Sequence, residues 1–179
     1  MTDNITHNNK EINLNKLRAS VLGANDGIVS TAAVMIGVAG ATTNNMAILV
    51  SAIAAVIGGA VSMSLGEYVS VASQRDVEQG SGIEEEEWTS PTIAAVASFF
   101  SFLLGALLPV IAGLIVPNEY IVYGIFVTTL IALGATGALS AYLSKTNITK
   151  AVIRLLVGGT IALAITYLTG NIVGEYVTV

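Results

Sequence analysis

Two carboxylates lie within stretches of sequence that are otherwise apolar enough to be membrane helices. Asp26 lies in residues 21–40, and Glu67 lies in residues 53–72. An acid at the middle of a spanning helix costs roughly 2.5–3.5 kcal/mol on translocon insertion scales, so such residues usually face a pathway or the interior of a bundle. The two acids are therefore the first candidates for a binding site.

Composition places the chain among integral membrane proteins. Of its 179 residues, 54% are hydrophobic and only 11% are charged, and the mean hydropathy is +0.77. Cysteine is absent, which excludes disulfides, thiolate metal sites and thiol redox chemistry. The net charge is −5 and no basic patch occurs, so no nucleic-acid partner is expected.

The sequence predicts an all-α membrane protein with five spanning helices. Five segments are long enough to cross a bilayer of roughly 30 Å, which takes about 20 helical residues. Barrel strands would instead show alternation over ~10 residues. The expected spans are residues 20–42, 46–74, 92–115, 119–142 and 151–173. They form one transmembrane domain with a polar cytosolic tail at 1–19, a short acidic cytosolic loop at 76–91 and an outer tail at 174–179.

The basic residues predict the orientation of the spans. They lie before the first span, at the end of the second, and between the fourth and fifth, so all fall on one side; the loops on the other side have none. The positive-inside rule then places the N-terminus in the cytosol and the C-terminus outside or in a lumen. No cleavable signal peptide is expected in the polar first eighteen residues, so the first span must direct insertion. The seven basic residues are Lys10, Lys16, Arg18, Arg75, Lys145, Lys150 and Arg154.

Counting from these basic residues predicts that the two acids share one depth. Asp26 follows Arg18 by eight residues, and Glu67 precedes Arg75, taken as the end of the second span, by eight. The first two spans are joined by a short connection and must pack as antiparallel neighbours, so both acids could hold one ligand. Met63 precedes Glu67 by one helical turn on the same face and adds a thioether.

Carboxylate and thioether donors together favour a divalent first-row cation. Fe²⁺ or Mn²⁺ suits this mixture better than Mg²⁺ or Ca²⁺, which prefer oxygen alone. Because a cation displaces protons from carboxylates, the same residues could run proton-coupled exchange. Asn25 and Ser30 are secondary candidates, and in a purely structural alternative they would satisfy Asp26 instead. Likewise, Glu67 could reach out to solvent, and Met63 could be core filler.

Several stretches resemble one known family. Residues 17–41, which contain the motif ANDG, and residues 59–78, which contain SMSLGEYVS, resemble the two most characteristic segments of the vacuolar iron transporter family. Residues 134–143 and 154–170 are similar to its last two helices. The resemblance covers nearly the whole chain and is most specific where the two motifs occur together.

The resemblance implies a homodimer of five-helix protomers, with a metal path formed by the first two helices at the interface. It implies proton-coupled export of Fe²⁺ or Mn²⁺ from the cytosol, across the cell membrane of a prokaryote or a vacuolar-type membrane otherwise. Asp26 matches the metal-binding aspartate of the family's first helix, and Met63 matches the metal-binding methionine of its second. Glu67 belongs to the GEYVS form of the motif, which some relatives lack. The metal is cargo, so no permanently bound cofactor is expected.

The segment after the second span departs from the family's pattern. Many relatives carry a long cytosolic helical insertion that collects metal, whereas only residues 77–90 separate Asp76 from Pro91 here. The acids of this segment could still attract cations by their local potential, or they could form a solvated linker. These secondary candidates are Glu78, Glu84, Glu85, Glu86 and Glu87.

Two other functions would also use or tolerate the acids. A small dimeric proton/organic-cation antiporter would alternate one membrane glutamate between proton and drug, but it would need aromatic walls, and only Tyr68 adjoins Glu67. A non-transporting membrane scaffold would not need either acid for its function. An enzyme is not expected, because the sequence has no Glu-x-x-His pair or other redox-metal motif.

Overall fold

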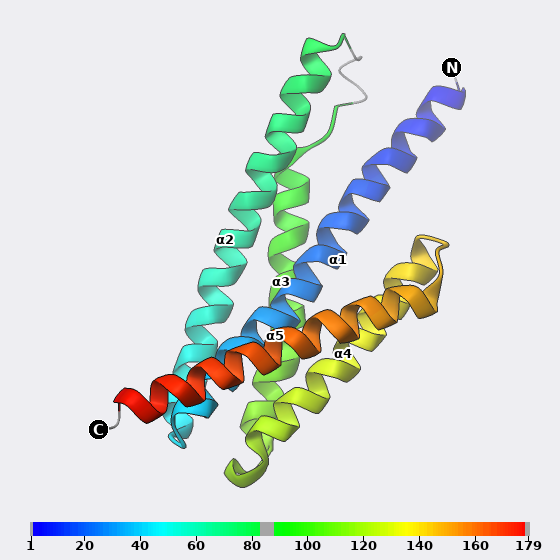
Figure 1. The fold of residues 1–179 in the computed structure, drawn as a ribbon. Helices are drawn as coiled ribbons and strands as arrows, with labels where there is room; N and C mark the ends of the chain where they lie inside the picture. Colours follow the sequence, from blue (N-terminus) through cyan, green and yellow to red (C-terminus); the bar gives the residue numbers. More distant parts are fainter. Residues whose placement is uncertain (1, 83–87, 178–179) are drawn as a thin grey trace.

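The chain folds into five long α-helices joined by short connections (Figure 1). The computed structural model describes residues 2–82 and 88–177, and the side chains within 17–82 and 88–176. All five helices of this part of the chain are long and apolar enough to cross a membrane, which confirms the predicted fold class. The elements are α1 (Thr2–Ala41), α2 (Asn45–Gly80), α3 (Pro91–Ile115), the 3-10 turn η2 (Asn118–Tyr120), α4 (Ile121–Leu143) and α5 (Ile148–Val177).

Local sequence explains where several helices begin and end. Asn44 caps α2, because its side-chain oxygen accepts hydrogen bonds from the backbone N–H groups of Met46 and Ala47 at 2.9 and 3.3 Å. Pro91 stands in the first turn of α3, where its missing N–H leaves no helical bond unmade. After α4, Lys145 takes a left-handed conformation with φ 53°, which ends the helix.

Three helices are longer than their predicted spans. α1 begins at Thr2, so the polar segment before residue 20 continues into the first span as one helix. α5 runs to Val177 and takes in most of the expected outer tail. α2 continues to Gly80, so the prediction that it ends at Arg75 is wrong. Hydropathy marks where a helix can leave the membrane, but helical hydrogen bonds continue into water wherever the chain supports them.

The first helix lies at the centre of the bundle. α1 packs against each of the other four helices, and the largest buried cluster contains residues of all five. Met35 and Ile36 of α1 lie in this cluster with Ile48 of α2, Ile125 of α4 and Leu163 of α5. Because α1 touches every neighbour, its side chains decide how the bundle is spaced.

α2 and α5 lie at the outside of the bundle. Less of their apolar windows is buried than in the other helices, 17% for α2 and 11% for α5. Large apolar side chains such as Ile57 and Leu65 on α2 and Ile161 on α5 are more than half exposed. A water-soluble protein would not present such surface, but lipid or another membrane helix can cover it.

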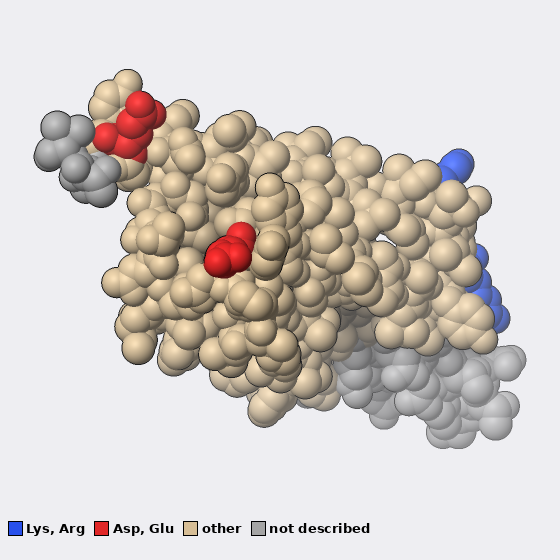
Figure 2. All heavy atoms as spheres, turned by 90° about the horizontal axis from the view of Figure 1, so that it is seen from below, with Lys and Arg blue, Asp and Glu red and all other residues tan. Residues whose placement is uncertain are grey.

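Charged side chains are sparse on the end of the bundle away from the N-terminus. Figure 2 looks onto this end and shows acidic side chains in few places and basic side chains only at one edge. The connections at this end, residues 42–44 and 116–120, contain no lysine or arginine. This is the end that the positive-inside rule assigns to the outside or lumen.

Glycines bring α1 and α3 into backbone contact beside Asp26. A Cβ atom on Gly27 would overlap the carbonyl oxygen of Phe102, and one on Gly105 would overlap the carbonyl oxygen of Ala24. Both obstacles are backbone atoms, which cannot move aside without shifting a helix. The close approach that the small residues predicted therefore occurs around Asp26, with α3 as the partner of α1.

Replacing Gly105 with alanine should destabilise the bundle by about 1–3 kcal/mol, because the added methyl group must push α1 and α3 apart. The matched control is Gly58→Ala on α2, where an added Cβ meets nothing within 4 Å. Thermal unfolding of both variants in detergent provides the measurement. Equal stability of the two variants would contradict the packing described here.

Candidate metal site

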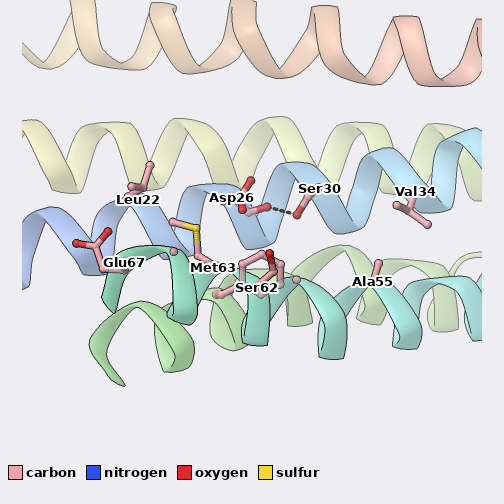
Figure 3. A pocket seen from close by; sticks show the side chains of 11 residues that line it. Leu22, Asp26, Ser30, Val34, Ala55, Ser62, Met63 and Glu67 are labelled. Carbon is pink, nitrogen blue, oxygen red and sulfur yellow. Dashed lines mark hydrogen bonds between the residues drawn. The ribbon is translucent and has the colours of Figure 1, made fainter. Parts of the chain in front are cut away.

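A groove of about 510 Å³ runs between α1 and α2 (Figure 3). Its floor includes Phe102 of α3, whose ring lies against Gly59 so closely that a Cβ on that glycine would overlap it. Met63 and both predicted acids line the groove, so the structure brings the three main candidate ligands to one cavity. The full lining is Leu22, Asp26, Ser30, Val34, Ala55, Gly59, Ser62, Met63, Gly66, Glu67 and Phe102.

The carboxylate of Asp26 is partly buried and has no protein partner in the described part of the chain. The nearby Ser30 hydroxyl donates its hydrogen bond to the backbone carbonyl of Asp26 and leaves the side chain unengaged. The structural alternative, in which Ser30 satisfies the Asp26 carboxylate, is therefore wrong. Ser30 itself lines the groove and adds a hydroxyl oxygen to it.

Asn25 does not join the groove. It lines a second cavity, of about 630 Å³, between α1, α4 and α5. Its side-chain oxygen is buried there and accepts no hydrogen bond from any described residue. Adjacent residues of α1 thus serve different cavities, as the 3.6-residue period of the helix requires.

Glu67 is buried and already paired. Its side chain is 5% exposed, and Nη2 of Arg18 lies 2.7 Å from its Oε1 atom. The alternative in which Glu67 reaches out to solvent is therefore wrong. This pairing was not predicted, since Arg18 was treated only as a marker of the membrane surface.

The two acids are not level, which corrects the predicted common depth. Counted from Thr43 in the turn between α1 and α2, Glu67 lies 24 residues along α2, whereas Asp26 lies only 17 residues back along α1. The difference corresponds to about 10 Å along the helices. The prediction failed because it took Arg75 as the end of α2. Counting from the shared turn would have found the pairing, because Arg18 lies 25 residues back.

Met63 lies between the two acids along the groove (Figure 3). Its side chain is partly buried and packs against the cluster formed by Ala60, Phe102 and Ala106. The thioether is therefore held in place by packing while it also lines the groove. Sulfur here stands between two oxygen ligands and not beside a single pair of them.

The acidic segment after α2 contributes a structural residue. Glu78 accepts hydrogen bonds from the side chain of Gln74 at 2.9 Å and from the backbone N–H and hydroxyl of Thr89 at 2.9 and 3.2 Å. Its carboxylate thereby ties the end of α2 to the start of α3. The ring of Trp88 lies 5.1 Å from the guanidinium of Arg75 in the same junction. Glu84, Glu85, Glu86 and Glu87 lie outside the described residues.

The groove offers a sparse and mixed set of donors. Among the described residues there is no group of three or more His, Asp or Glu side chains that could hold a metal. A cation in the groove would instead meet one free carboxylate, one thioether and hydroxyl groups, together with Glu67 if Arg18 were displaced. Such a set suits brief occupancy by a cation in transit better than permanent binding.

Five membrane-length helices around an acid-lined groove define a multi-pass integral membrane protein. The model of the VIT family matches residues 17–86 and 77–171, and the chain belongs to this family. Vacuolar iron transporter homolog 1 of Oryza sativa subsp. japonica is 44% identical over 164 residues, which cover 84% of this chain and 71% of that protein. Vacuolar iron transporter homolog 3 of Arabidopsis thaliana is 42% identical over 168 residues, which cover 89% and 84%. The resemblance found in the sequence is thereby confirmed.

The Arg18–Glu67 pair should show a coupling energy in a double-mutant cycle. Unfolding in detergent would be compared for the wild type, Arg18→Gln, Glu67→Gln and the double variant. We expect a coupling of about 0.5–1 kcal/mol, because Glu67 is buried but Arg18 is half exposed to solvent. Strictly additive effects would show that the two side chains do not interact.

Proposed function

We propose that this chain moves divalent transition-metal ions, Fe²⁺ or Mn²⁺, out of the cytosol in exchange for protons. The observation that carries the proposal is the Asp26 carboxylate, which lies in a groove within a spanning segment and has no described partner. A charge in this position is costly unless something compensates it, and a passing cation would do so. The relatives' printed name, vacuolar iron transporter homolog, supports iron as the cargo.

The order of the ligands along the groove suggests a path. A cation from the end of the groove nearest Arg18 would meet Glu67 first, then Met63, then Asp26 (Figure 3). A thioether in the middle of this path favours cations of intermediate softness over Mg²⁺ and Ca²⁺. The proposed transport ligands are therefore Asp26, Met63 and Glu67, with the Ser30 hydroxyl beside them.

Proton exchange follows from the chemistry of the carboxylates. A carboxylate in a water-poor groove holds either a cation or a proton, because the bare anion is poorly solvated there. When the metal leaves Asp26 on the far side, a proton would take its place and return. Net charge in the membrane is thus kept low in both directions.

The open side of the groove supports a homodimer. Gly58 and Gly66 on α2 have nothing within 4 Å of an added Cβ, and apolar side chains such as Ile57 and Leu65 beside them are exposed. Small residues flanked by apolar ones are the usual contact surface between membrane helices. A second copy packed on α2 would close the groove against lipid and would place two copies of the site together.

The lining favours a metal ion over an organic cation. Phe102 is the one aromatic residue of the groove, and Tyr68, which an organic-cation site would need, does not line it. A drug-sized cation usually requires several aromatic or apolar walls around its charge. We further propose that the N-terminus is cytosolic, and that the membrane is the cell membrane or a vacuolar-type membrane.

Flux through reconstituted liposomes tests the proposal. Asp26→Ala should lower Fe²⁺ or Mn²⁺ flux driven by a pH gradient at least about tenfold, because the central compensating charge is lost. Glu119→Gln is the matched control, since it removes an exposed carboxylate outside the groove and should leave flux unchanged. Undiminished flux in Asp26→Ala would overturn the proposed site. Unchanged thermal stabilisation of Asp26→Asn by Mn²⁺ would do the same.

A further inference from the structure

Arg18 lies between the two cavities of α1. On one side its Nη2 atom holds the buried Glu67 carboxylate at the end of the groove, at 2.7 Å. On the other side Arg18 lines the second cavity, together with Asn25, Ser140 and Ser144. One cation of the protein thus contacts the proposed metal path and a separate polar pocket.

The guanidinium occupies the coordination space of Glu67. A charge-assisted bond of this length uses the oxygen that a metal ion would need, so a cation can bind Glu67 only by displacing Arg18. No other ion pair is present among the described residues, so no second basic group competes for either acid. The resting charge of Glu67 is therefore already compensated, in contrast to that of Asp26.

The second cavity gives the released side chain a place to go. Arg18 is half exposed, and its long stem allows the charged head to move while the backbone stays fixed. The cavity offers the hydroxyls of Ser140 and Ser144, and the buried oxygen of Asn25 has no donor among the described residues. An acceptor without a donor is costly, and a guanidinium with five N–H groups is suited to supply one.

We propose that Arg18 is a built-in competitor for Glu67 and thereby a specificity-determining residue of the cytosolic entrance. A monovalent cation gains nothing by exchange, because the guanidinium carries the same charge and better hydrogen-bonding geometry. A divalent cation gains from its second charge and displaces Arg18 toward the second cavity. The inference rests on the proposed function, since it concerns the same groove.

Metal binding to the full-length protein in lipid nanodiscs tests this competition, with Mn²⁺ as the probe and electron paramagnetic resonance of free Mn²⁺ as the readout. Arg18→Gln should bind Mn²⁺ roughly tenfold more tightly, because one competing positive charge is gone. Binding to this variant should also become sensitive to K⁺. Arg18→Lys should stay near the wild type, and Arg154→Gln, which removes an exposed basic residue elsewhere, should change nothing.

A chemical readout follows the arginine itself. Modification by phenylglyoxal, quantified at each site by mass spectrometry, should rise several-fold at Arg18 when Mn²⁺ is added and should not rise with K⁺. Arg154 provides the internal control. In Glu67→Gln, Arg18 should react rapidly with or without metal.

The outcomes separate the two proposals. If Asp26→Ala weakens Mn²⁺ binding but Arg18→Gln leaves it unchanged or weaker, the competitor role of Arg18 is overturned and the transport site stands. If Asp26→Ala has no effect on binding, the transport site itself is overturned. Labelling of Arg18 that does not respond to Mn²⁺ in the wild type would also overturn the competitor role.

Discussion

The arrangement of this protein depends on how it compensates charge where water is scarce. Two carboxylates lie in helices that otherwise suit lipid, and each requires a cation or a polar path. Glu67 has its cation in Arg18, from within the same chain. Asp26 has none among the described residues, although it lies in the same groove. The difference between a paired and an unpaired acid gives the groove a direction, from an occupied entrance to an unoccupied interior.

Backbone packing determines the shape of that groove. Phe102 of α3 contacts both walls, because its carbonyl group lies against Gly27 of α1 and its ring lies against Gly59 of α2. A side chain at either glycine would require the helices to shift. Since α1 packs against every other helix, a shift there would disturb the whole bundle. The glycines thus hold Asp26 and Met63 at a fixed spacing across a narrow gap.

Much of this could be predicted from the sequence, because hydropathy and helix length determine how many spans cross a bilayer. Asp26, Met63 and Glu67 were predicted to share a site, and the structure brings them to one groove. Their relative depth was predicted wrongly, because a basic residue marks the membrane surface only when nothing within the protein binds it. Arg18 is bound to Glu67, and α2 continues past Arg75, so neither residue was a reliable marker. The direction of Asn25 into a second cavity depends on helix rotation, which sequence spacing alone does not determine.

The central claim is that a transition-metal ion binds in the groove between α1 and α2. Anomalous diffraction from crystals of the protein soaked with Mn²⁺ would locate the ion directly. The account predicts a peak beside the Asp26 carboxylate and within reach of the Met63 sulfur, and its absence in Asp26→Ala. A peak only outside the groove, for example at the acidic segment that follows α2, would contradict it.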